Sequence, residues 1–487
     1  MNTQATADVA PVARTDIAAT YDQLAPQRET WIEKNAYFYE EDERYMRFLV
    51  PEGQRVLEIG CGIGQLLAAL SPSYGLGIDI SPEMVRLAGD RYPDLEFQVG
   101  DAEDPATLAN LNTTFDVVIV SDTIGVIRDC QRLLDNIASV CTPDTRVIIA
   151  YYSPYWEPLL RAAHAFGQTM PQPQQNWLTT SDIAALLELS NYQLIKREWR
   201  VLIPRRLLGV GRLINRLIAP FPLIRRFSLR NYLVARPHPK VPNETATSRP
   251  STTVLVPCRN ERGNVEAAVL RTPKFCDDME ILFAEGGSSD GTYEEIERVI
   301  AKYPQHDIKV IRQQGSGKGN AVREGFAAAR GDILMILDGD LTMPPEDLPK
   351  FYEALSQGKG EFVNGSRLVY PMEQEAMRFL NEVANHLFSI VFTWLLNQRF
   401  TDTLCGTKAL SRDHYEKINA NRSFFGDFDP FGDFDLIFGA AKLNLKVVEV
   451  PVRYAARVYG ETQISRFSHG LLLFRMIGFA FRKLKAL

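Results

Sequence analysis

The stretch Gly315–Pro345, GSGKGNAVREGFAAARGDILMILDGDLTMPP, decides how the C-terminal half of the chain folds. A glycine-rich loop opens an amphipathic helix that ends at Gly331, and a short apolar strand, ILMIL, follows it. The strand delivers Asp338 and Asp340, separated by one glycine, at its C-terminal end. Strands that alternate with helices in this way predict a parallel sheet covered by helices on both faces.

Asp338 and Asp340 are the candidate metal ligands and the first candidate catalytic residues. Mg²⁺ and Mn²⁺ prefer carboxylates combined with phosphate oxygens from a substrate. The pattern therefore implies a nucleotide diphosphate as ligand. An Asp-x-Asp triplet alone is often only a solvated turn. Here it follows an apolar strand and precedes Pro344 and Pro345, which restart a helix at its first turn, and this context favours the metal site.

Length and composition indicate two ordinary globular domains. The chain has 487 residues, which exceeds the size of a typical single core. A net charge of −6 argues against a general nucleic-acid-binding protein. The six cysteines show no CxxC spacing, so they predict neither a metal knot nor a disulfide framework, and a reducing compartment is favoured.

The location expected from sequence is cytoplasmic, with peripheral contact at the cytoplasmic face of a membrane as an option. Residues 1–19 lack the apolar core of a secretion signal and predict a loose N-terminal tail. No run reaches the roughly 18 apolar residues of a membrane-spanning helix. The apolar runs at 386–396 and 471–481 are short, so they suit either a membrane surface or a packed core.

A linker separates the two halves. Residues 237–250, PHPKVPNETATSRP, are rich in proline and small polar residues and have no hydrophobic period. A new strand starts directly after them at Thr252. We therefore expect one domain at 20–236 and a second at 251–487, each an α/β domain with its ligands at the carboxyl ends of the strands.

The N-terminal half carries its own ligand loop. The strand that ends VLEI leads into GCGIG, which supplies Gly60, Gly62 and Gly64 after Glu58. Glycines let a ligand approach the backbone, and the N-terminus of the next helix presents unpaired N–H groups. Two further strands end in Asp79 and Asp101. Glu58 and Asp101 could also be no more than helix caps or solvated loop acids.

This series of strand ends resembles the class I S-adenosylmethionine-dependent methyltransferases over residues 20–236. The resemblance implies that Glu58 and the three glycines surround the methionine part of the cofactor. It further implies that Asp79 binds the ribose, that Asp101 lies near the adenine, and that Asp122 borders the methyl-acceptor pocket. Tyr21 would belong to a lid, and no residue identifies the methyl acceptor.

An arginine-rich stretch closes this half. Residues 203–237 contain eight arginines and no acidic residue, interleaved with Leu, Ile and Phe. One interpretation is an element that rests on an anionic membrane surface. The other is a domain-packing helix whose arginines are solvated.

In the C-terminal half, four loops follow strands in the order expected for a nucleotide-diphosphate site. They read PCRNE, EGGSSDGT, GSGKG and DGD. Over residues 252–465 the series resembles the family 2 inverting glycosyltransferases with the GT-A fold, in the polyprenyl-phosphate (dolichyl-phosphate mannose synthase-like) branch. The resemblance places Asp338 and Asp340 on metal. The nucleoside and pyrophosphate positions that it implies are Pro257, Glu261, Glu285, Asp290 and Lys318.

One departure from this family concerns the base. The family usually has paired aspartates where this chain has Glu285 and Gly286, so the nucleotide is left open. By the same resemblance Arg367, Arg378 and Arg457 would hold an acceptor phosphate, which needs no strong general base. A hydroxyl acceptor would need a carboxylate base, for which Asp433 and Asp435 are the candidate catalytic residues.

The sequence thus predicts two doubly wound α/β domains, a Rossmann-like methyltransferase domain followed by a GT-A glycosyltransferase domain. The expected cofactors are S-adenosylmethionine and Mg²⁺ or Mn²⁺. The expected partners are a nucleotide sugar, a polyprenyl-phosphate or glycan acceptor and a membrane surface, with no nucleic acid. The alternative is transfer to a sugar hydroxyl, with the N-terminal domain serving as a docking module without chemistry.

Overall fold

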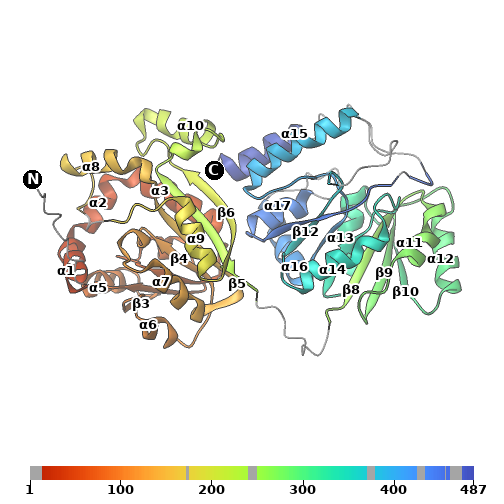
Figure 1. The fold of residues 1–487 in the computed structure, drawn as a ribbon, viewed down its shortest axis with the longest axis horizontal. Helices are drawn as coiled ribbons and strands as arrows, with labels where there is room; N and C mark the ends of the chain where they lie inside the picture. The colour runs from red at the N-terminus through yellow and green to blue at the C-terminus, as the bar shows by residue number, and fades with distance from the viewer. Residues whose placement is uncertain are drawn as a thin grey trace, which may run out of the picture. The chain divides into compact units, whose positions relative to one another are not determined.

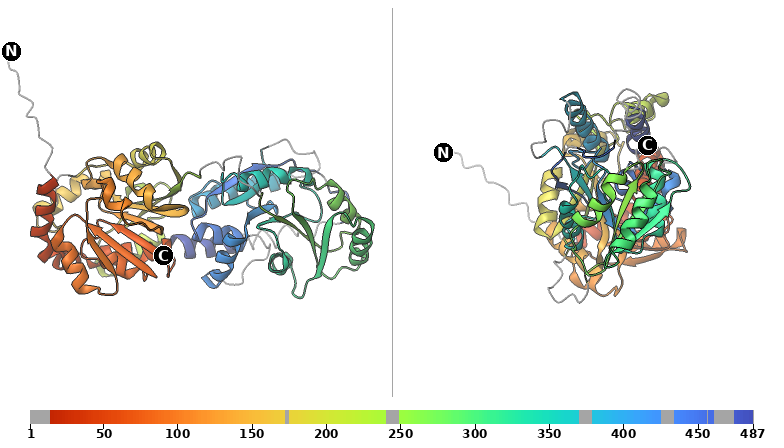
Figure 2. Two further views of the ribbon diagram at one scale, coloured as in Figure 1. Left: turned by 90° about the horizontal axis from the view of Figure 1, so that it is seen from below. Right: turned by 90° about the vertical axis from the view of Figure 1, so that its right-hand side faces the viewer.

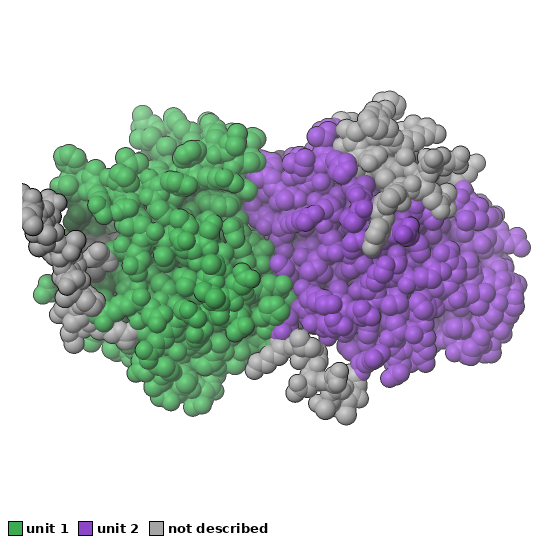
Figure 3. Space-filling model, viewed as in Figure 1, with its two compact units in different colours: residues 1–238 green, residues 239–487 purple. Residues whose placement is uncertain are grey.

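Two seven-stranded sheets, one in each half of the chain, organise the protein (Figure 1). The computed structural model describes residues 14–171, 175–239, 249–369, 379–424, 434–455, 457–460 and 474–486. The chain divides into two units, Met1–His238 and Pro239–Leu487, which Figure 3 colours separately. Each unit is described by itself.

The sheet of unit 1 has the strand order β3-β2-β1-β4-β5-β7-β6. Its strands are β1 (Arg55–Ile59), β2 (Tyr74–Asp79), β3 (Glu96–Val99), β4 (Phe115–Ser121), β5 (Cys141–Tyr152), β6 (Tyr192–Arg200) and β7 (Arg230–Pro237). Its helices are α1 (Arg14–Leu24), α2 (Arg28–Lys34), α3 (Ala36–Leu49), α4 (Gln65–Ala69), α5 (Pro82–Arg91), α6 (Pro105–Ala109), α7 (Cys130–Ile137), α8 (Glu157–Ala165), α9 (Thr180–Leu189) and α10 (Val210–Leu217).

Helices cover both faces of this sheet, as Figures 1 and 2 show. Consecutive residues of β1 and β4 are buried, because side chains on the two faces of a central strand both meet helices. The core cluster of unit 1 joins β1, β2, β4 and β5 to α7 and α9. The doubly wound fold expected from sequence is thus confirmed for this unit.

The sheet of unit 2 has the order β10-β9-β8-β11-β13-β12-β14. Its strands are β8 (Thr252–Cys258), β9 (Met279–Glu285), β10 (Asp307–Arg312), β11 (Ile333–Ile336), β12 (Phe362–Ser366), β13 (Lys408–Ser411) and β14 (Val447–Pro451). Its helices are α11 (Val265–Arg271), α12 (Thr292–Lys302), α13 (Lys318–Ala328), α14 (Leu348–Ser356), α15 (Phe379–Leu396), α16 (Arg412–Ala420) and α17 (Phe434–Lys442).

Each sheet contains one antiparallel strand that the sequence pattern did not predict. In unit 1, β7 runs antiparallel between β5 and β6. In unit 2, β13 runs antiparallel between β11 and β12. Strand–helix alternation predicts parallel neighbours only for consecutive strands, and both of these strands insert between strands that precede them in the chain.

The strand order places one crevice in each unit. In unit 1, β1 pairs in parallel with both β2 and β4, and in unit 2, β8 pairs in parallel with both β9 and β11. Connections leave these central strands in opposite directions, so a crevice opens at their carboxyl ends. The candidate ligand residues lie at these two edges.

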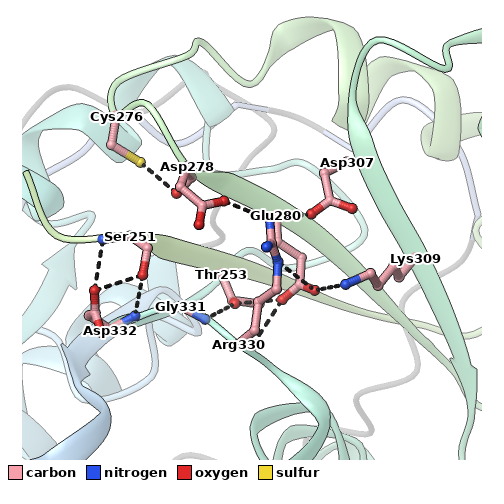
Figure 4. A network of polar contacts seen from close by, with 10 residues as sticks. All are labelled: Ser251, Thr253, Cys276, Asp278, Glu280, Asp307, Lys309, Arg330, Gly331 and Asp332. Carbon is pink, nitrogen blue, oxygen red and sulfur yellow. Dashed lines mark hydrogen bonds and ion pairs between the residues drawn. The ribbon is translucent and has the colours of Figure 1, made fainter.

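The opposite edge of the unit 2 sheet is held by a network of polar contacts (Figure 4). Glu280 is buried at the start of β9, where it accepts hydrogen bonds from Thr253 Oγ1 at 2.6 Å and Lys309 Nζ at 2.8 Å. Arg330 donates its backbone N–H to the same carboxylate and forms ion pairs with Asp278 and Asp307. Because these groups join the amino-terminal ends of neighbouring strands, they stabilise the sheet away from the ligand edge.

Candidate functional site

The glycine loop after β1 has the backbone that only glycine adopts freely. Gly60, Gly62 and Gly64 all have positive φ, at +74°, +52° and +75°. A Cβ at Gly60 would lie 1.9 Å from Thr123 Oγ1, and one at Gly64 would lie 2.6 Å from the Phe97 ring. The loop is therefore fixed in shape, and its backbone faces the carboxyl edge of the sheet.

Glu58 is a buried acid directly before this loop. Its side chain is almost fully buried, and no described group forms a hydrogen bond with its Oε2. Burial raises the pKa of Glu58 to about 8, and the nearby Asp79 and Asp42 carboxylates add to the rise. A cationic ligand group placed here would supply the positive charge that this carboxylate needs.

Asp79 is the last residue of β2 and Asp101 lies two residues after the end of β3, and their carboxylates order the surrounding loops. Asp79 Oδ2 accepts from Gly62 N at 2.8 Å, and its Oδ1 accepts from Ser81 N at 2.9 Å. Asp101 Oδ1 accepts from Glu103 N at 2.9 Å. Burial raises the pKa of Asp79 above its ordinary value. Each carboxylate keeps lone pairs that can accept hydrogen bonds from a ligand.

These residues line one cavity of about 170 Å³ at the crevice of unit 1. Gly64 is not part of the wall and packs against Phe97 instead. The residues predicted from sequence that do line the cavity are Tyr21, Glu58, Gly60, Gly62, Asp79, Asp101 and Asp122.

Sequence reasoning missed the buried ion-pair cluster behind this cavity. Arg230, at the start of β7, is fully buried, and its Nε lies 2.9 Å from Asp42 Oδ1. Its Nη1 pairs with Asp122, and its Nη2 donates to Ser121 Oγ at 2.7 Å. Asp42 and Asp122 both line the cavity. Arg230 lies within the arginine-rich stretch, so composition could not distinguish it from the exposed arginines around it.

A second cavity of about 160 Å³ adjoins the first. Arg28, Tyr39, Tyr152 and Met170 line both cavities. The walls of the second are largely aromatic and aliphatic, with Trp31, Phe38, Trp156, Leu159, Leu160, Pro204, Arg205 and Leu229 among its lining residues. A cofactor in the acidic cavity and an acceptor in the apolar one would meet at the shared wall.

In unit 2, Asp338 follows β11 and is paired with a lysine. Lys318 Nζ, at the start of α13, lies 2.6 Å from Asp338 Oδ1. Burial alone would raise the pKa of Asp338, but the Lys318 ammonium, helped by the charges of Lys408 and Arg367, lowers the pKa below its ordinary value. Gly406 lets these groups meet, because a Cβ there would lie 1.9 Å from Asp338 Oδ2 and 2.4 Å from Lys318 Nζ.

Asp340 has a different cation. Arg457 Nη2 lies 2.7 Å from Asp340 Oδ2, and Arg457 Nη1 lies 3.1 Å from Glu261 Oε1. The Thr342 hydroxyl donates to Asp340 Oδ1 at 2.9 Å. Two carboxylates and a neighbouring hydroxyl form the hard oxygen donor set that Mg²⁺ and Mn²⁺ prefer, so the residues present fit a divalent metal.

The loops after β8 and β9 are joined by hydrogen bonds beside this pair. Asn260 N donates to Ser288 Oγ at 2.9 Å, and Ser289 N donates to Asn260 Oδ1 at 2.9 Å. Pro257 lies in β8 just before this loop. Asn260, which has a positive φ of 57°, was not singled out from sequence. The two loops together form one surface next to the candidate metal ligands.

The acids predicted to bind the nucleoside also accept hydrogen bonds from these loops. Glu285 Oε1 accepts from Ser288 N at 2.6 Å. Asp290 accepts from Thr292 N at 3.0 Å at the start of α12 and from Tyr459 OH at 3.3 Å. Gly286, where the family usually has an aspartate, lies against Gln313, since a Cβ there would be 2.9 Å from Gln313 Oε1.

The residues predicted to act on the acceptor lie at separate places in unit 2. Arg367 forms a two-pronged ion pair with the buried Asp402, at 2.6 Å and 2.9 Å. Arg457 instead reaches the Asp340 site. Asp435 lies on α17, 3.7 Å from Arg323, and lines a separate small cavity. Arg378 and Asp433 lie outside the described residues.

Comparison with known families agrees with this division. Residues 253–418 match the family described as glycosyl transferase family 2. Residues 31–197 match a family described as methyltransferase domain. The two matches fall in unit 2 and unit 1, respectively.

Two curated relatives align with the C-terminal half. A dolichol-phosphate mannosyltransferase of Pyrococcus furiosus is 30% identical over 238 residues, which are 48% of this chain and 63% of the relative. The glycosyltransferase AglJ of Haloferax volcanii is 30% identical over 223 residues, which are 45% of this chain and 69% of the relative. The chain thus spans less than two thirds of the first relative.

Solved structures resemble each half. A SAM-dependent methyltransferase from Thermotoga maritima aligns with 45% of this chain and 99% of its own, at 15% identity and a TM-score of 0.35. Glucosyl-3-phosphoglycerate synthase from Mycobacterium tuberculosis, in complex with Mn²⁺, UDP and phosphoglyceric acid, aligns with 48% of this chain and 78% of its own, at 19% identity and a TM-score of 0.36.

Proposed function

The chain belongs to glycosyltransferase family 2, and from this premise we propose that unit 2 transfers a sugar from a nucleotide sugar, with inversion, to a polyprenyl phosphate or a lipid-linked glycan. The observation that carries the proposal is the pair Asp338 and Asp340 at the end of β11, with Lys318 2.6 Å from the first carboxylate. A divalent metal held by the two carboxylates would neutralise the leaving diphosphate.

Other residues of unit 2 would bind the diphosphate and the nucleoside of the donor. Lys318 lies where it can exchange its contact with Asp338 for a diphosphate oxygen. The joined loops at Asn260 and Ser288 offer a surface for the nucleoside. As the bond between the anomeric carbon and the diphosphate breaks, an acceptor oxygen bonds to that carbon from the opposite face.

The acceptor proposal is supported by chemistry and by the relatives. A phosphate oxygen is already anionic at neutral pH, so no general base is required. The name of the Pyrococcus relative points to a lipid phosphate acceptor. For a hydroxyl acceptor, Asp433 and Asp435 stay candidate bases. Since the acceptor lipid resides in a membrane, we place the enzyme at the cytoplasmic membrane surface. Among the helices that the structure describes, none is long and apolar enough to cross a bilayer.

For unit 1 we propose methyl transfer from S-adenosylmethionine to a related glycan or precursor. The acidic cavity fits a ligand that carries positive charge and hydroxyl groups, because Glu58, Asp79 and Asp101 line it. The adjoining aromatic cavity is the place we assign to the acceptor. The cofactor would supply an electrophilic methyl group, and the shared wall at Tyr39 and Tyr152 would orient the acceptor toward it.

Turnover of nucleotide sugars tests the assignment of unit 2. A panel of UDP- and GDP-sugars is assayed with Mn²⁺ and a short polyprenyl phosphate, and the release of UDP or GDP is measured. The variant Asp338→Ala, Asp340→Ala should lose at least about a thousandfold in turnover. The matched control is Asp332→Ala, at the opposite end of the same strand, where the carboxylate accepts from Ser251. Equal turnover in the double variant and the parent would refute the site.

Titration calorimetry with S-adenosylmethionine tests the assignment of unit 1. We expect binding by the full chain and its loss in Gly60→Val, since a side chain there collides with Thr123. No binding by the parent would instead favour the docking-module alternative, in which unit 1 performs no chemistry.

A further inference from the structure

Helix α10 of unit 1 exposes its apolar side chains, which is the reverse of what a helix does when it packs into the core of a soluble protein. Its buried residues are Gly211 and Asn215, and its exposed ones include Val210, Leu213 and Leu217. Amphipathic helices of globular proteins bury their apolar stripe. Here the leucines face outward.

Specific contacts hold α10 in this orientation. Asn215 Oδ1 accepts from Ile203 N at 2.9 Å, while its Nδ2 donates to Ile203 O at 2.8 Å and to Tyr37 OH at 3.1 Å. A Cβ at Gly211 would lie 2.0 Å from Arg205 O, so the backbones there meet closely. The outward display of leucines is therefore fixed by packing.

The segments on either side of α10 extend the apolar surface. Leu208 is fully exposed and has a positive φ of 55°. This backbone conformation is strained for a residue with a branched side chain. Leu223 is 85% exposed. Directly before α8, Tyr155 is 71% exposed, and its ring centroid lies 6.3 Å from that of Phe227. Figure 1 shows α8 and α10 on the same side of unit 1.

The charged residues of the segment that contains α10 are all positive. Residues 203–227, which we call the arginine–leucine segment, contain six arginines and no acidic residue. Arg205, Arg212 and Arg226 are exposed. Arg206 is paired with Glu40 at 2.6 Å, and the Arg225 guanidinium lies over the Trp199 ring. Cationic groups beside protruding leucines complement an anionic bilayer surface, in which the leucines enter the headgroup region.

We propose that the arginine–leucine segment, together with α8, docks unit 1 on an anionic lipid surface. The docking surface also shares Leu159 and Arg205 with the wall of the aromatic cavity. A lipid-linked methyl acceptor lying in the bilayer would therefore reach that cavity; this last step rests on the proposed methyl transfer, whereas the docking does not.

The test uses the full chain and flotation with vesicles. Phosphatidylcholine vesicles with about 30 mol% phosphatidylglycerol are compared with pure phosphatidylcholine vesicles. The parent should bind the anionic vesicles, and its binding should weaken with added salt. The variant Leu208→Ser, Leu213→Ser, Leu223→Ser should lose at least about tenfold in partition coefficient. The variant Arg205→Gln, Arg212→Gln, Arg226→Gln should lose about as much on anionic vesicles alone.

Matched controls separate this surface from general stickiness. Leu189→Ser with Leu270→Ser changes leucines that are exposed on α9 and α11, and it should bind like the parent. All variants should keep the unfolding midpoint of the parent, because the changed side chains are exposed. Vesicle binding by the leucine variant equal to that of the parent overturns the proposal, as does a parent that binds no vesicles. A parent that is dimeric without lipid and becomes monomeric in the leucine variant also overturns it, because the surface would then join two copies of the chain.

Discussion

The acidic sites of the two units lie at the same place in their folds, but the pKa values of their carboxyl groups are shifted differently. In unit 1, burial raises the pKa values of Glu58, Asp79 and Asp122. In unit 2, burial would also raise the pKa of Asp338, but Lys318, Lys408 and Arg367 together lower it, and Arg367 lowers the pKa of the buried Asp402. Burial favours the neutral acid and a nearby cation favours the charged one.

The difference matches the ligands proposed for each unit. A carboxyl group whose pKa is raised above neutrality is largely uncharged at neutral pH. It becomes a good binding partner only when a cationic ligand group, such as a sulfonium or ammonium group, stabilises its charged form. An acid that protein cations already keep ionised can accept a divalent metal at any physiological pH, while the displaced cations can turn to phosphate oxygens. Three changes would break or sharpen this contrast.

The largest effect is expected from Arg230→Met in unit 1. The change leaves Asp42 and Asp122 buried without their guanidinium, which should lower the free energy of unfolding of unit 1 by about 3–5 kcal/mol. Tryptophan fluorescence can follow this unit, because Trp31, Trp156, Trp177 and Trp199 belong to it and only Trp394 belongs to unit 2.

Three results would test this expectation. Arg230→Lys keeps the charge but not the forked geometry, so it should lose less stability than Arg230→Met. Sugar transfer by unit 2 should persist in both variants under native conditions. An unchanged fluorescence midpoint in Arg230→Met would show that the two carboxylates do not depend on this arginine.

The next effect concerns Glu58 and pH. The raised pKa means that Glu58 is protonated in the free protein below about pH 8. A cationic cofactor binds the carboxylate form, so the affinity for S-adenosylmethionine should fall about tenfold for each pH unit below 8 and level off above it. Calorimetry across this range measures the slope. Glu58→Gln should bind weakly with no such slope, whereas Glu96→Gln, at an exposed strand position, should keep the slope of the parent.

The same residue predicts a stability effect of defined sign. Glu58 has a folded-state pKa above its unfolded value, so its contribution is fully present below the ordinary glutamate pKa near 4.5 and is lost as the pH rises to about 8. Without cofactor, the midpoint of the parent should therefore fall over this range relative to Glu58→Gln. A constant difference between the two proteins would contradict the raised pKa.

The smallest effect is expected from Lys318→Met in unit 2. The lysine competes with a metal for Asp338 but assists the diphosphate, so its loss should change the two affinities in opposite directions. We expect Mn²⁺ alone to bind about tenfold more tightly and a nucleoside diphosphate with Mn²⁺ about tenfold more weakly. Lys309→Met removes a lysine from the network in Figure 4 and should change neither affinity. Weaker Mn²⁺ binding in Lys318→Met would contradict the proposed competition.

Much of the candidate site was predictable because its motifs are local. The glycine loop after β1 and the Asp-Gly-Asp turn after β11 each follow an apolar strand directly, and strand ends on one edge of a sheet converge. Sequence therefore predicted that Glu58, Asp79 and Asp101 would share a cavity, as the structure shows.

The partners of these acids were not predictable in the same way. Arg230 lies 188 positions from Asp42, and Arg457 lies 117 positions from Asp340. Nothing in composition distinguishes Arg230, which is buried, from Arg212, which is exposed. Likewise, the direction of β7 and β13 depends on where each strand inserts in its sheet.

The sequence alone therefore determined two α/β units, their strand-end acids and the loops that follow the strands, because spacing over a few residues controls turns, helix starts and the faces of strands. Only the tertiary structure decided which cation stabilises which carboxylate, that Arg367 pairs with Asp402, and that the leucines of α10 face outward. These outcomes depend on contacts between distant segments, since the charge state of a buried acid is set by its surroundings in space.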